Sequence, residues 1–238
     1  MVTRLRLVMA GLTALVAFLL VAIMACNGGG GEGEATPTPV ATEVQDQLKR
    51  MVLQLEDLPS GVIRAEEFFT TNEESAAEST DREGRLAMLK KWGRILGYDV
   101  TYQPTPALAS VVGLMLVNGA ASLYSSEEGA KASFADAVQT ARTTLTAGVI
   151  GTEGTEAAKM EEVTSPPLTD EMMWLRMTAK ADEEEGVEAE TFADDIVIFR
   201  QGPARAYLRI WWIMGSGRSD FIQQLVEAQA RRLKDALP

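Results

Sequence analysis

The chain has 238 residues with 34 acidic and 22 basic side chains, a net charge of −12 that argues against a nucleic-acid partner and against a domain lying flat on an anionic bilayer. It has no histidine and a single cysteine, Cys26, so Cys–His nucleophiles, Ser-His-Asp triads and the usual zinc ligand sets are excluded. We predict no metal site, no cofactor and no catalytic residues.

The first 26 residues are typical of an exported, lipid-anchored protein. Arg4 and Arg6 form a short basic region, and an uncharged apolar run follows from Leu7 to Ala25. The run ends in Ile23-Met24-Ala25-Cys26, which resembles the lipobox of bacterial lipoproteins. The resemblance implies a signal peptide over residues 1–25 and a lipid, with acyl chains such as palmitate, on the thiol of Cys26.

Two alternatives stay open for this segment: an uncleaved N-terminal membrane helix, and a plain signal peptide with an incidental cysteine. Lipidation would explain why an exported protein has one cysteine, and two or more acyl chains anchor a protein stably where one does not. We expect an extracytoplasmic protein held by the lipid on Cys26 at the outer face of the cell membrane. Loss of Arg4 and Arg6 with the signal would change the net charge from −12 to −14.

Residues 26–43 are expected to form a disordered tether, because they are rich first in Gly and then in Thr and Pro and have no hydrophobic face. Residues 44–238 are expected to form one extracytoplasmic domain. In chain order, their apolar periodicity predicts a helix over 44–55, a strand over 62–71, a loop over 71–82, a helix over 85–95, a strand over 97–104, a buried bent strand over 108–124, a helix from a capping box at Ser125 to Gly148, strands near 159–164, 172–181, 193–200 and 204–214, and a helix over 219–237.

This order of elements predicts an α+β fold, with a central antiparallel sheet of about six or seven strands and about three main packing helices. Between two of the later strands, the acidic run from Asp182 to Gly186 could collect Ca²⁺ together with Glu188 and Glu190. A solvated turn is the simpler interpretation, because the spacing does not match an EF-hand loop.

The last two strands form a hairpin whose register the sequence leaves open. A three-residue loop over 201–203 would place Asp195 opposite Arg209. A two-residue loop would place Arg200 opposite Arg205, and like charges in that position are unfavourable. We therefore expect the three-residue loop. Asp194 and Asp195 fall on opposite faces, so they are not expected to form a catalytic dyad.

The second strand of this hairpin carries the candidate ligand-binding residues, which share one face: Arg205, Tyr207, Arg209 and Trp211. Arginines interleaved with aromatic rings can grip an anionic or planar ligand by charge and by cation–π contact. The alternative is a face covered by a helix, with the arginine stems lying over the rings.

Several short motifs resemble a group of secreted bacterial lipoproteins and extracytoplasmic domains whose fold is similar to that of the PsbP photosystem accessory protein. The motifs span roughly Leu48 to Leu237: Asp57-Leu58-Pro59-Ser60-Gly61, Leu123-Tyr124-Ser125-Ser126, a helix with Phe134, Phe199-Arg200-x-Gly202, and a final helix with Gln229, Arg232 and Leu233. The resemblance implies an antiparallel sheet with helices on its faces and a binding or accessory role. It brings no catalytic residues.

These observations favour a non-enzymatic binding or accessory module at the cell membrane, which takes a small apolar or amphiphilic ligand or an envelope protein as partner. An envelope enzyme such as a hydrolase using carboxylate, Ser or Lys chemistry is an alternative, weakened by the absence of His, the usual proton-transfer residue near neutral pH. A purely structural envelope lipoprotein is the third interpretation.

Overall fold

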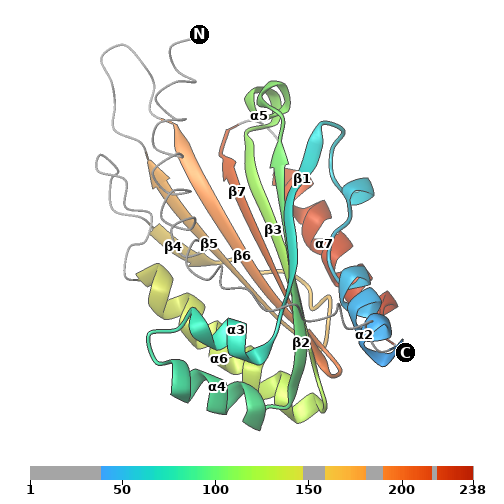
Figure 1. The fold of residues 1–238 in the computed structure, drawn as a ribbon. Helices are drawn as coiled ribbons and strands as arrows, with labels where there is room; N and C mark the ends of the chain where they lie inside the picture. Colours follow the sequence, from blue (N-terminus) through green and yellow to red (C-terminus); the bar gives the residue numbers. More distant parts are fainter. Residues whose placement is uncertain (1–38, 147–158, 181–189, 216–218, 238) are drawn as a thin grey trace, which may run out of the picture. The chain divides into compact units, whose positions relative to one another are not determined.

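The computed structural model describes residues 39–146, 159–180, 190–215 and 219–237 (Figure 1). Cys26 and most of the expected tether lie outside these ranges. The elements run in the following order: α2 (Pro39–Arg50), η1 (Leu55–Asp57), β1 (Val62–Thr70), α3 (Asn72–Ala77), α4 (Arg82–Lys91), β2 (Arg94–Pro104), α5 (Pro106–Val112), β3 (Leu114–Tyr124), α6 (Glu127–Thr146), β4 (Lys159–Glu162), β5 (Glu171–Lys180), β6 (Thr191–Gln201), β7 (Ala204–Ile213) and α7 (Ser219–Asp235).

The strands form one seven-stranded sheet in the order β1-β2-β3-β7-β6-β5-β4, and every neighbouring pair is antiparallel. The longest helices are α2, α6 and α7. The predicted α+β class, with an antiparallel sheet and three main helices, is confirmed. Within the described ranges, no helix is long and apolar enough to cross a membrane.

The main core lies between one face of the sheet and the helices α2 and α7, which lie close together in Figure 1. Tyr98, Val100 and Tyr102 are buried on this face of β2, as their alternation predicts. A smaller apolar cluster lies on the other face, where α6 packs Phe134, Ala137, Val138 and Ala141 against β5 and β6. The sheet is therefore covered on both faces.

Two helices replace predicted loop or strand. Residues 72–77 form α3, because Thr71 and Glu74 make a reciprocal capping box: the Glu74 N–H donates to Thr71 Oγ1, and the Thr71 N–H donates to the Glu74 carboxylate. Residues 106–112 form α5, which begins with Pro106 and ends at Gly113, whose φ of +67° suits a C-cap glycine. The expected bent strand over 108–124 is correct only from Leu114 onward.

Three helices also have boundaries that differ from the prediction. The first helix begins at Pro39 and ends at Arg50, so it starts inside the expected tether. The helix predicted over 85–95 is α4, Arg82–Lys91, and residues 94 and 95 belong to β2. The cap of α6 is Ser126 and not Ser125, because the Ser126 hydroxyl accepts a hydrogen bond from the Gly129 N–H at 3.1 Å.

The predicted register of the last hairpin is wrong. The loop has two residues, Gly202 and Pro203, and Arg200 lies opposite Arg205. The two guanidinium groups are drawn apart, because Arg200 forms ion pairs with Asp170 and Glu171 while Arg205 donates to the Ser133 carbonyl oxygen on α6. Gly202 has a φ of +48°, the backbone conformation that a two-residue hairpin requires at its first position.

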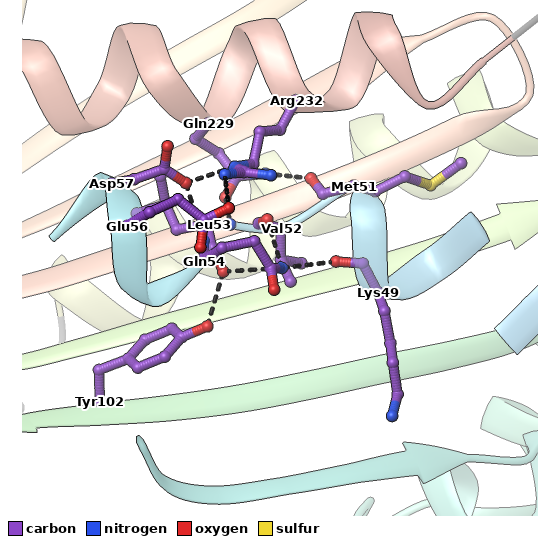
Figure 2. Close-up of polar contacts among 10 residues, drawn as sticks. All are labelled: Lys49, Met51, Val52, Leu53, Gln54, Glu56, Asp57, Tyr102, Gln229 and Arg232. Atoms are coloured by element: carbon purple, nitrogen blue, oxygen red, sulfur yellow. Dashed lines mark hydrogen bonds and ion pairs between the residues drawn. The ribbon is translucent and has the colours of Figure 1, made fainter. Parts of the chain in front are cut away.

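Gln229 connects the two helices that cover the main core face (Figure 2). Its side chain is fully buried on α7. The side-chain amide donates to the Met51 carbonyl oxygen at 2.6 Å and accepts from the Leu53 N–H at 3.0 Å. Both backbone groups belong to the segment that follows α2. The Gln229 side chain therefore provides hydrogen-bond partners for backbone groups that lie outside any helix or strand.

The same segment is held from two more directions (Figure 2). The Tyr102 hydroxyl on β2 donates to the Leu53 carbonyl oxygen at 2.6 Å. On the outer side, the guanidinium of Arg232 on α7 binds Asp57 and Glu56 of η1. The first and last helices of the domain are thus fixed to each other and to the sheet through the residues between α2 and η1.

Replacing Gln229 with Leu leaves the buried Met51 carbonyl and Leu53 N–H without partners. We expect the Gln229→Leu substitution to lower the free energy of unfolding by roughly 2–4 kcal/mol in urea titrations, since each unsatisfied buried group costs about 1–3 kcal/mol. Gln224→Leu is the matched control, because Gln224 lies on the same helix and is exposed. Equal effects of the two substitutions would contradict the role given to Gln229.

Candidate functional site

The candidate residues Arg205, Tyr207, Arg209 and Trp211 lie on one face of β7, and the intervening Leu208, Ile210 and Trp212 are buried in the main core on the other face. Antiparallel pairing places Ala120 of β3 beside Tyr207 and Asn118 beside Arg209. The candidate residues do not share one environment, because α6 covers only part of this face.

Arg205 and Tyr207 belong to the covered part. Arg205 Nη1 lies 3.4 Å from the Ser133 carbonyl oxygen of α6, and the Tyr207 ring packs with the apolar residues of α6, β5 and β6. Burial raises the pKa of Tyr207 to about 12. For these two residues the alternative interpretation, a sheet face covered by a helix, is the correct one.

Arg209 and Trp211 form the accessible part. The side chain of Arg209 is 47% exposed and makes a bidentate ion pair with the buried Asp194, with Nε–Oδ1 at 2.9 Å and Nη2–Oδ2 at 2.6 Å. Hydrogen bonding to Asp194 raises the pKa of Arg209 further above its usual value. Trp211 lies opposite Asp194 in the ladder and is half-buried.

The Asp194 carboxylate changes what this surface can bind. It neutralises the Arg209 charge and holds the guanidinium plane still, so the exposed face of the guanidinium is available for stacking more than for capturing a free anion. Asn118 and Leu116, both half-buried on β3, lie opposite Arg209 and Trp211. We define the exposed strip as these four residues, of which Arg209 is exposed and the other three are half-buried: Arg209, Trp211, Leu116 and Asn118.

A buried arginine lies on the same face of the sheet, nearer to α3. Arg94 donates to Ser122 Oγ at 3.2 Å, to the Thr70 carbonyl oxygen at 3.0 Å and to Thr70 Oγ1 at 2.8 Å. It lies directly over Gly97, where a Cβ atom would stand 1.9 Å from Arg94 Nη2. Gly97 is therefore needed for the close approach of the guanidinium to the strand.

Asp99 lies beside Ala120 and on the same face as Tyr207, and its carboxyl group interacts electrostatically with Arg94 and Arg205. Burial is the main cause that raises the pKa of Asp99 to about 6, and Glu78 adds to the rise, while Arg94 and Arg205 oppose it. The carboxyl group therefore changes charge close to neutral pH.

The sequence interpretation missed a cluster around Asp195 on the main core face. Asp195 is fully buried. Its Oδ1 accepts from Trp174 Nε1 at 2.5 Å and Arg176 Nε at 2.9 Å, and its Oδ2 accepts from Trp212 Nε1 at 2.6 Å. The Arg176 guanidinium also lies 5.7 Å and 5.4 Å from the rings of Trp174 and Trp212.

The wrong hairpin register caused this omission, because it assigned Asp195 to Arg209. In the structure Asp195 lies opposite Arg176 of the neighbouring strand β5 and forms an ion pair with it. Asp194 binds Arg209 on the opposite face of the sheet. The two aspartates therefore form no dyad, as predicted. Both oxygens of Asp195 are occupied by protein donors, so this cluster holds β5, β6 and β7 together and has a structural role.

Cys26 and the acidic run over 182–186 lie outside the described residues. Within the described ranges, no group of three or more Cys, Asp or Glu side chains is arranged to hold a metal ion.

Comparisons with known proteins add little. No protein-family model matches the chain, and no curated protein matches its sequence. Among solved structures, the chain is similar to the extracellular domain of PknH from Mycobacterium tuberculosis, with a TM-score of 0.46 and 10% sequence identity over 81% of this chain and 95% of that chain. A likeness at this TM-score and identity carries no argument about function.

The raised pKa of Asp99 predicts a stability effect with a defined sign. The folded state holds the Asp99 proton more tightly than the unfolded state. The stabilisation of the fold by this proton is therefore complete below about pH 4 and is lost as the pH rises through about 6. Compared with the wild type, Asp99→Asn should therefore gain unfolding free energy between pH 4 and pH 7, by at most about 3 kcal/mol.

Glu67 provides a control of opposite sign, because a hydrogen bond from the Tyr98 hydroxyl lowers the pKa of its carboxyl. The ionised Glu67 carboxylate stabilises the fold above its ordinary pKa, and this stabilisation is lost as the pH falls. Glu67→Gln should therefore destabilise the protein more at pH 7 than at pH 4. Denaturant titrations at both pH values measure both effects. Parallel pH profiles for Asp99→Asn and the wild type would contradict the assignment.

Proposed function

We propose that the mature protein is a lipid-anchored, extracytoplasmic, PsbP-like binding or accessory module without enzymatic activity. The N-terminal segment supports the anchor, because its apolar run ends in a lipobox-like sequence at Cys26. Within the described domain, the two buried aspartates on β6 are each paired with an arginine and tied into the sheet, which does not favour them as groups that transfer protons.

The exposed strip is the observation that carries the binding proposal. Trp211 and the neutralised guanidinium of Arg209 present flat, partly apolar groups on a rigid sheet, and Leu116 extends the apolar area. These groups suit a small apolar or amphiphilic ligand, or an apolar segment of an envelope protein. Stacking and apolar burial would supply the affinity, so the binding should depend little on salt.

The anchor can be tested with Cys26→Ser in the full chain. The wild type should incorporate labelled fatty acid and lose the mass of residues 1–25, while the Cys26→Ser variant should do neither, since the thiol is the site of lipid attachment. Mass spectrometry and membrane fractionation measure these properties. A variant that is still processed at the same place and still incorporates lipid would rule out the lipobox interpretation.

The exposed strip can be tested by native mass spectrometry of the full chain released from detergent micelles. We expect an adduct of lipid-like mass on the wild type and at least tenfold less of it on Trp211→Ala, because the substitution removes the stacking surface. Val111→Ala is the control, since Val111 is an exposed apolar residue of α5. An adduct that survives Trp211→Ala, or an adduct-free wild type, would contradict a ligand at this strip.

A further inference from the structure

Strand β1 is an exposed edge of the sheet. Among the described strands it pairs only with β2, so the outer backbone groups of its nine residues have no ladder partner. The opposite edge strand, β4, has only four residues. Two large apolar side chains of β1 are exposed, Ile63 at 54% and Phe68 at 42%. A long edge strand with exposed apolar side chains is a template for pairing with another chain, although the charged residues and the bulge of β1 weaken that tendency.

A bulge decides which β1 side chains share a face. Residues five positions apart point to opposite faces of a regular strand. The pairing of β1 with β2 shifts between Arg64 and Glu66, so Ile63 and Phe68 lie opposite Gln103 and Asp99, two positions on one face of β2. By the same shift Arg64 and Glu67 share the other face, opposite Tyr102 and Val100.

This face pattern is self-complementary. We propose that β1 pairs in antiparallel orientation with β1 of a second copy of this chain, about a two-fold axis that passes through the two bulges. Ile63 then lies beside Phe68 of the second copy, and Arg64 lies beside Glu67 of the second copy. Each contact occurs twice, because a two-fold interface uses the same patch on both partners. Without the bulge, these pairs would point to opposite faces.

Two features limit the strength of this pairing. The bulge interrupts the ladder, but only at the axis, with regular strand on both sides. Glu66 lies next to the axis and close to Glu66 of the second copy, and like charges there oppose association. Arg64 and Glu67 already form an ion pair within the chain at 2.9 Å, and Lys49 lies 4.0 Å from the same carboxylate, so the second copy adds to charges that are already partly neutralised.

Cysteine cross-linking tests the register. Full chains carrying Ile63→Cys or Phe68→Cys are prepared in detergent, each in the Cys26→Ser background so that no other thiol is present. We expect a disulfide-linked dimer when the two variants are mixed and oxidised, and none from either variant alone. The two copies of position 63 would stand roughly 15 Å apart, too far for a disulfide. Cross-linking of a single variant, or none in the mixture, overturns the proposal.

Charge exchange tests the contacts. The wild type is compared with Arg64→Glu and with the exchanged pair Arg64→Glu/Glu67→Arg by sedimentation velocity in detergent. We expect Arg64→Glu to raise the dimer dissociation constant about tenfold, because it creates two repulsive cross-strand pairs, and the exchanged pair to restore at least part of the loss. Glu66→Gln should lower the constant. A monomeric wild type at 100 μM, or Arg64→Glu without effect, overturns the proposal.

Discussion

The buried amide of Gln229 is the contact on which the packing of the main core depends. Its donor and acceptor satisfy Met51 and Leu53, whose backbone groups have left helix α2 and have not entered another regular element. A buried segment of this kind is tolerated only where each polar group finds a partner. Because Tyr102 binds the same segment from β2, the sheet, α2 and α7 all meet there.

The charged groups inside the sheet follow a second constraint. Adjacent residues Asp194 and Asp195 point to opposite faces, and each is matched by an arginine from a neighbouring strand, Arg209 on β7 or Arg176 on β5. A buried carboxylate without such a partner would take up a proton or destabilise the fold. The two pairs therefore fix strands β5, β6 and β7 in one register, since a shift by one residue would exchange the faces of both aspartates.

Local patterns in the sequence were sufficient for most of the fold. The alternation of Tyr98, Val100 and Tyr102 predicts both the strand and its buried face, and the helical spacing around Phe134 predicts the inner side of α6. Helix α5 was hidden inside a long apolar run, although Pro106 and Gly113 are start and stop signals that could have revealed it. The Thr71 and Glu74 capping box of α3 was a similar missed signal.

The site was less predictable because its partners come from distant strands. The alternation along β7 correctly places Arg209 and Trp211 on one face. The neutralisation of Arg209, however, depends on the hairpin register, and that register depends on Asp170 and Glu171 drawing Arg200 away from Arg205. A comparison limited to the hairpin itself selects the wrong loop. The role of Gln229 is equally non-local, because its partner Leu53 lies 176 positions earlier in the chain.

The position of α2 also has a mechanical consequence. Any tension applied to the chain before Pro39 enters the described domain through α2, where it meets first the hydrogen bond from Gln47 Nε2 to the Ala236 carbonyl oxygen at 3.1 Å and then those at Met51 and Leu53. The first turns of α2, before Gln47, would unwind before the load reached the sheet. The contacts of Gln47, Gln229 and Tyr102 would thus confine the unwinding to the start of α2 and keep the load from the sheet.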